Sequence, residues 1–178
     1  MKMEFVKIVS AELTTCHSLF QGLYMTTAVT PNIASHSRLG PLASRLVDVD
    51  SLSWQTTRFE GIVYKPLLFD RNSGIATVLM RMSPGSVLPD HEHVLIEQTW
   101  VIEGHLVDKT GPDEGMECKA GQFIWRPAGS RHSAWSPKGG TFLAMFQIPN
   151  KFFAINGDVT DMAGADWESI WGTHPSQT

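Results

Sequence analysis

The chain has 178 residues, of which 42% are hydrophobic and 18% are charged, so it is long and apolar enough for one domain with a buried core. Its net charge of −4 argues against a nucleic-acid partner, which normally leaves a basic patch. No apolar run approaches the roughly 18 residues of a membrane span, and Cys16 and Cys118 form no cluster. We expect a cytoplasmic protein with reduced thiols and no membrane partner.

Residues 1–44 are predicted to be an N-terminal extension or arm that precedes a domain over residues 45–178. Residues 5–9 alternate enough for a short strand. Residues 26–44 are mostly Thr, Ser, Ala, Pro and Gly, which is the composition of a loop or an extended arm. Such an arm is either disordered by itself or packed on a partner subunit.

Short apolar runs follow, with Gly and Pro between them, and they recur about every ten residues. The expected strands cover residues 61–69, 75–82, 99–102, 105–108, 123–125 and 141–147. A hairpin turn is expected at Glu103 and Gly104. Because no helix-length amphipathic run occurs before residue 150, the pattern predicts an all-β sandwich or barrel. Residues 161–171 are predicted to form a short C-terminal helix.

Three histidines and one carboxylate have spacings that a barrel can bring to one point. His91 and His93 are two residues apart, so both side chains leave the same face of a strand. Glu97 also follows at an even spacing, and His132 belongs to a neighbouring strand. A His-x-His pair alone is more often surface or hydrogen-bonded, but the inward faces of a barrel converge on its lumen. We predict one divalent transition metal per chain, with Fe, Zn, Ni and Mn all compatible.

The same residues carry a resemblance to the cupin superfamily. The cupin motif G-x5-H-x-H-x3-E-x6-G covers residues 85–104, and the motif G-x5-P-x-G-x2-H-x3-N covers residues 121–136. The matched positions are Gly85, His91, His93, Glu97 and Gly104 in the first motif, and Gly121, Pro127, Gly129 and His132 in the second. Ser136 stands where the second motif ends in Asn. The resemblance implies a double-stranded β-helix, or jelly roll, with one metal in the lumen and a homodimer as the usual assembly.

Cupins include enzymes and non-enzymes, so the fold alone does not decide the function. A centre of three histidines and one glutamate resembles that of dioxygenases acting on small organic substrates, with Glu97 as a ligand or a catalytic base. The alternative is a non-catalytic metal- or ligand-binding regulatory cupin. Residues 106–108 and 126–132 resemble, more weakly, the cupin domain of zinc anti-sigma factors. Residues 1–44 contain no convincing helical sigma-binding domain, which favours the enzyme; an isomerase or lyase is less favoured.

Several side chains near the ligands in sequence are candidates for contacts with a substrate. They are Arg81, Gln98, Trp100, Trp125 and Phe146, with Trp135 as a further aromatic. Arg81 and Arg126 are of the type that binds a carboxylate. Core packing is nevertheless the favoured interpretation for the aromatics, and a solvated or salt-bridged surface position is favoured for the arginines. Alternation sends about half of each strand outward. His105 follows the expected turn and is predicted to be exposed.

Overall fold

The computed structural model describes residues 27–70, 72–147 and 149–171. The chain divides into two compact units, one of Met1–Thr27 with Ile33–Leu46 and one of Ala28–Asn32 with Val47–Thr178. In the first unit, a short 3-10 helix, η1 (Ala34–Arg38), interrupts the segment that was predicted to be a loop. The predicted strand at residues 5–9 lies outside the described residues.

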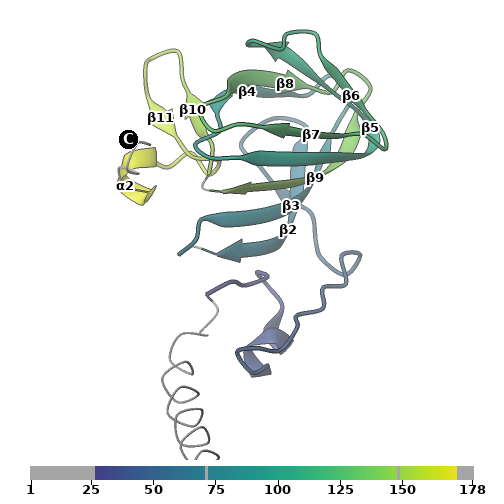
Figure 1. The fold of residues 1–178 in the computed structure, drawn as a ribbon, viewed down its shortest axis with the longest axis vertical. Helices are drawn as coiled ribbons and strands as arrows, with labels where there is room; N and C mark the ends of the chain where they lie inside the picture. Colours follow the sequence, from purple (N-terminus) through teal and green to yellow (C-terminus); the bar gives the residue numbers. More distant parts are fainter. Residues whose placement is uncertain (1–26, 71, 148, 172–178) are drawn as a thin grey trace, which may run out of the picture. The chain divides into compact units, whose positions relative to one another are not determined.

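The second unit is an antiparallel β structure, and Figure 1 shows its strands curling into a half-barrel. One part of the sheet runs β1-β2-β3-β9-β5-β7 and the other runs β6-β5-β8-β4-β10-β11. The strands are β1 (Gln55–Thr56), β2 (Ile62–Asp70), β3 (Ile75–Met82), β4 (Val87–Glu92), β5 (Glu97–Thr110), β6 (Glu117–Lys119), β7 (Phe123–Arg126), β8 (Arg131–Trp135), β9 (Gly140–Gln147), β10 (Lys151–Phe153) and β11 (Val159–Thr160). This confirms the predicted all-β jelly-roll fold.

Strand β5 belongs to both parts of the sheet. Its first half pairs with β9 and β7, and its second half pairs with β6 and β8. The predicted hairpin at Glu103 and Gly104 is therefore wrong, because the chain bends there without reversing. Gly104 has a φ of +71°, and a side chain at this position would collide with the carbonyl of Gly139. Only glycine adopts this positive φ and also leaves room for the Gly139 carbonyl without strain.

The core lies between the two parts of the sheet. Ile62 of β2 pairs with Met82 of β3, and Met80 of β3 and Val101 of β5 both pair with Phe142 of β9; none of these side chains is more than 7% exposed. Fully burying a side chain of this size stabilises the folded state by about 1.5–3 kcal/mol. The core therefore fixes which face of each strand looks inward, and so which side chains can reach the lumen.

The C-terminal helix is present but shorter than predicted, because α2 covers only Trp167–Trp171. Residues before it turn instead, since Asp161 Oδ1 accepts hydrogen bonds from the backbone N–H groups of Ala163 (2.8 Å) and Ala165 (3.1 Å). Trp167 is 2% exposed and its indole N–H donates to the carbonyl of Pro149 at 3.1 Å. Among the described residues, no helix has the length and apolarity that crossing a membrane would require.

Candidate metal centre

The four predicted ligands meet at one end of strands β4, β5 and β8. His91 on β4 pairs directly with His132 on β8, His93 follows the end of β4, and Glu97 begins β5. The three histidines are at most 4% exposed and Glu97 is 9% exposed. Potential ligand atoms of the three histidines lie within 4.8 Å of one another. These histidines can bind one metal ion.

Hydrogen bonds fix the orientation of all three imidazole rings. Each Nδ1 lies within hydrogen-bonding distance of an oxygen that can only accept, so each Nδ1 carries a proton and Nε2 is the nitrogen left to bind a metal. The acceptors are Pro89 O for His91 (2.7 Å), Asn150 Oδ1 for His93 (3.1 Å) and Asp108 Oδ1 for His132 (2.8 Å). Such partners are what a metal site needs to aim imidazole nitrogens at the ion.

The Nε2 atoms of these rings face one another and the Glu97 carboxylate. Nε2 of His93 lies 2.9 Å from Nε2 of His132 and 2.9 Å from Oε2 of Glu97. Burial, followed by repulsion from His93 and His132, lowers the pKa of His91 to about 3, so this ring is neutral at neutral pH. Donor atoms this close in a buried site need a proton or a metal ion between them, and this donor set fits a divalent transition metal. Glu97 as a fourth ligand stays a prediction.

A buried ion pair between Arg126 and Asp108 lies next to the predicted ligands. Arg126, predicted to be a surface residue or a carboxylate clamp, is only 5% exposed. Its Nη2 lies 2.6 Å from Asp108 Oδ1, and its Nη1 lies 3.8 Å from Glu97 Oε2. Burial alone would raise the pKa of Glu97, but His93 and Arg126 outweigh it and hold that pKa below its usual range. Both carboxylates therefore remain ionised, and Arg126 links one ligand to the partner of another.

Comparison with known proteins identifies the family. Residues 43–151 match the model of the ChrR cupin-like domain. The chain belongs to this family. No curated protein matches it.

Solved structures show the same fold in several bacteria. A protein from Methylibium petroleiphilum described as a candidate acetylacetone dioxygenase is 22% identical, with a TM-score of 0.61 over 74% of this chain and 96% of its own. An acetylacetone dioxygenase from Acinetobacter johnsonii is 20% identical, with a TM-score of 0.58 over 72% and 89%. A cupin-like protein of unknown function from Ralstonia eutropha is 26% identical, with a TM-score of 0.51 over 63% and 70%.

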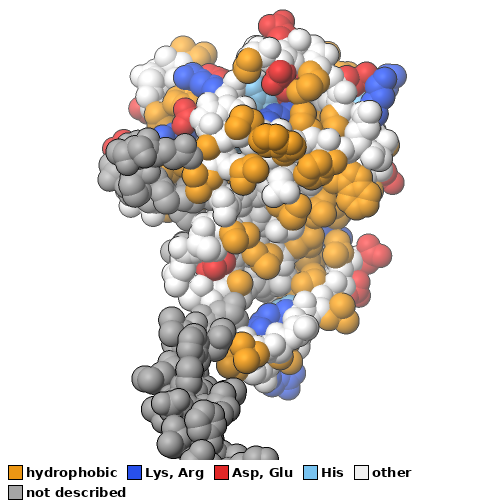
Figure 2. All heavy atoms as spheres, viewed as in Figure 1, with side chains coloured by type: hydrophobic (Ala, Val, Ile, Leu, Met, Phe, Trp, Pro, Cys, Tyr) orange, Lys and Arg blue, Asp and Glu red, His pale blue; other side chains and the backbone are white. Residues whose placement is uncertain are grey.

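Most of the predicted substrate residues lie on the outer face of this cupin barrel. Gln98 pairs with Trp125 one position out of phase with Glu97 and Arg126, so alternation turns both away from the ligands. Trp100 is 49% exposed and Trp125 is 58% exposed, and Figure 2 shows hydrophobic side chains gathered over β5, β7 and β9. The guanidinium carbon of the exposed Arg81 lies 4.2 Å from the centre of the Trp54 ring. The structure does not bring these four candidates to the metal centre.

Phe146 is the candidate that the structure does bring to the site. It pairs with Glu97 across β9 and β5, and both line a partly open cavity of about 570 Å³. Asn150, which orients His93, also lines this cavity. The other walls are mainly hydrophobic side chains from β2, β3 and β9. A cavity of this size and character can hold a small organic molecule beside the metal centre.

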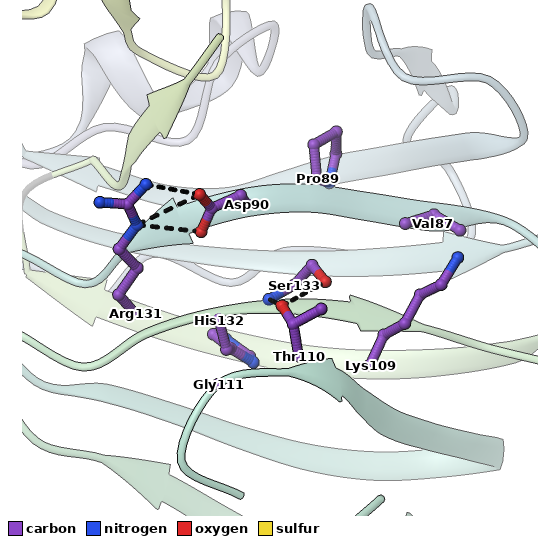
Figure 3. A pocket seen from close by; sticks show the side chains of 9 residues that line it. All are labelled: Val87, Pro89, Asp90, Lys109, Thr110, Gly111, Arg131, His132 and Ser133. Carbon is purple, nitrogen blue, oxygen red and sulfur yellow. Dashed lines mark hydrogen bonds and ion pairs between the residues drawn. The ribbon is translucent and has the colours of Figure 1, made fainter. Parts of the chain in front are cut away.

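A second hollow, of about 540 Å³, lies over β4, β8 and the end of β5 (Figure 3). Of the predicted ligands, only His132 lines it. Arg131 closes one side by a 2.6 Å ion pair with Asp90, and hydrogen bonding by this guanidinium lowers the pKa of the Asp90 carboxyl. These two charges satisfy each other, and Lys109 adds a further charged side chain to the lining.

Three functional or buried polar residues escaped the sequence analysis. His105 was predicted to be exposed, which is wrong, because it is 7% exposed and its Nε2 lies 3.6 Å from Glu117 Oε1. Asp108 and Asn150 were not identified as partners of His132 and His93. Asp108 is an odd number of residues from Glu97, so counting alternate positions along β5 places it on the wrong face. The register shift between Val101 and Glu103 in the pairing with β9 changes that count.

Proposed function

We propose that this protein is a mononuclear metal-dependent enzyme of the dioxygenase type, acting on a small organic substrate. One observation carries the proposal. Three imidazole Nε2 atoms and the Glu97 carboxylate converge beside an apolar cavity of about 570 Å³, and Glu97 itself lines that cavity. A molecule in the cavity would therefore have the reacting centre at its end and hydrophobic walls around the rest.

The contacts of each residue indicate the role that it would have in metal binding. His91, His93 and His132 would hold the metal through Nε2, and Glu97 through Oε2. A bound metal would act as a Lewis acid on a substrate oxygen and, if iron, would supply redox chemistry with O₂. Glu97 Oε1 accepts a hydrogen bond from the Thr99 hydroxyl at 3.1 Å, which fixes the plane of the carboxylate. Glu97 also lies on the cavity wall, but its lowered pKa makes it a weak base, which favours the role of metal ligand over that of proton acceptor.

The structural neighbours lend support to an oxygen-dependent reaction. Two of the similar structures, at 22% and 20% identity, have names that refer to acetylacetone dioxygenase. Likeness at this level shows a shared fold, so we take from it only the class of reaction to be tested first.

Oxygen consumption tests the proposal directly. The purified chain, loaded with iron, is assayed with a panel of diketones, thiols and aromatic acids in an oxygen electrode. We expect uptake with at least one substrate class, and none from His91→Ala or from zinc-loaded protein. Iron-loaded protein with full occupancy and no uptake across the panel would contradict the enzyme.

A non-catalytic regulatory module of the anti-sigma kind is the second candidate, favoured by the weaker sequence resemblance to zinc anti-sigma factors. It predicts a stable complex with a sigma factor and no turnover. Pull-down with purified sigma factors, run on the same iron- and zinc-loaded preparations, separates the two functions.

A further inference from the structure

Arg58 is an exposed cation at the mouth of the same partly open cavity, and nothing in the metal centre accounts for it. It lines the same cavity as Glu97 and Phe146. Its Nη2 donates to Thr160 Oγ1 at 2.7 Å and to the main-chain carbonyl of Asp161 at 3.1 Å. Both acceptors are neutral, and over residues 27–70, 72–147 and 149–170 Arg58 makes no ion pair. Its charge is held by neutral groups and faces both solvent and the cavity, whose lining also includes Asp161.

Aromatic rings place this guanidinium close to the metal centre. The guanidinium carbon lies 4.7 Å from the centre of the Phe59 ring and 5.4 Å from that of Phe152. The Phe152 ring in turn stacks on His91, with ring centres 5.2 Å apart and planes inclined by 28°. One phenyl ring therefore separates the Arg58 cation from a ligand imidazole. Such cation–π contacts orient a guanidinium and leave its edge available for hydrogen bonds.

The wall between the two polar ends is hydrophobic. It includes Tyr64 and Pro66 from β2, Val78 and Met80 from β3, and Phe146 from β9. A ligand with several polar groups along its length would lose hydrogen bonds to water here without replacing them. A ligand with an apolar body would gain from burial.

We infer that the substrate is an organic acid with an apolar body, whose carboxylate binds Arg58. The body lies along the hydrophobic wall, and a further polar group of the substrate reaches the histidine end. This inference rests on the proposed function and specifies its substrate class. Arginine is suited to the task because its planar fork binds both oxygens of a carboxylate at once. The Glu97 carboxylate cannot bind the carboxylate of a substrate, because both groups are negatively charged.

Calorimetric titration of zinc-loaded protein tests the inference without turnover. The probes are hydrocinnamate and octanoate, each compared with its neutral primary amide. We expect each acid to bind at least about tenfold more tightly than its amide, a difference of about 1.4 kcal/mol. Arg58→Gln should remove that advantage and leave amide binding unchanged, while Arg58→Lys should restore part of it. Arg38→Gln, an exposed arginine in the other unit of the chain, serves as the matched control.

The outcomes separate this inference from the proposed function. Absence of binding by both acids, or acid binding that Arg58→Gln does not weaken, would overturn the role of Arg58 even if the protein holds a full complement of metal. Loss of metal from the Arg58→Gln variant would show a structural role instead, and also counts against the inference. Acid recognition as expected, combined with no oxygen uptake on iron-loaded protein, would keep the acid site and reject the dioxygenase.

Discussion

The two faces of strand β5 place their side chains in opposite environments, one buried and one exposed. On the inner face, Glu97, Thr99 and Val101 are at most 9% exposed, and Glu97 meets the histidines. On the outer face, Trp100 is 49% exposed and Ile102 is 43% exposed. These residues alternate within six positions of sequence. Closeness in sequence to a ligand therefore says little about function here, and the parity of a position decides which environment its side chain enters.

The largest difference between the faces is expected on removing an inner-face imidazole. His132→Ala should reduce bound metal from about one ion per chain to nearly none, because it removes one of three neutral nitrogen ligands. Trp125→Ala, on the outer face of β7, is the matched control and should keep full occupancy. Elemental analysis of both variants after dialysis against metal-free buffer measures the effect. Full occupancy in His132→Ala would show that the histidines do not hold the metal.

The next largest effect is expected from Asp108, the hydrogen-bond partner of His132. Asp108→Ala removes the acceptor that holds His132 Nδ1, and loss of such a partner typically weakens metal binding about 10–100-fold. It also breaks the shorter of the two ion pairs of the buried Arg126 and leaves the 3.8 Å contact with Glu97, and breaking a buried pair costs up to about 3–5 kcal/mol of folding stability. The double variant Asp108→Ala with Arg126→Met removes the Arg126 charge as well. Competition with a chelator and urea unfolding should show stability recovering while metal affinity stays low; recovery of both would mean that Asp108 acts only through stability.

A smaller effect is expected from acidification, which should lower the stability of the metal-free protein through the buried His91 on the inner face. His91 keeps its neutral form down to about pH 3 in the folded metal-free protein, whereas in the unfolded chain it takes up a proton near pH 6.5. Between these values the unfolded state binds more protons, so the stability of the metal-free protein should fall as the pH decreases through this window. Urea unfolding of the metal-free protein across this range measures the slope. His91→Gln should reduce that slope, and an unchanged slope would assign it to other groups.

The smallest effect on the metal is expected from the outer face itself. Replacing Trp100 and Trp125 together by serine should leave metal content unchanged, because neither side chain points toward the ligands. The same variant probes the homodimer, which stays a prediction. We expect light scattering to give about twice the chain mass of 19.7 kDa for the wild type, and less for the double variant if this exposed apolar cluster is buried between subunits. A wild-type monomer would contradict the predicted dimer.

The sequence predicted what depends on local patterns. Alternation and turn residues placed β2, β3, β7 and β9 to within a residue or two, and the even spacing of His91, His93 and Glu97 predicted that they meet. The positive φ of Gly104 depends on the approach of Gly139 from a distant turn, so the continuous β5 could not be read locally. For the same reason the partners of the histidines were missed. Asp108 and Asn150 reach them only through pairing that the fold creates.

X-ray absorption at the metal edge of the purified protein tests the central claim most directly. With His91, His93 and His132 as ligands, the spectrum should show three imidazole nitrogens, at about 2.0–2.1 Å if the metal is zinc, together with oxygen from Glu97 or water. Scattering from sulfur, or fewer than two imidazoles around the ion, would contradict a metal centre built from the inner face of this barrel.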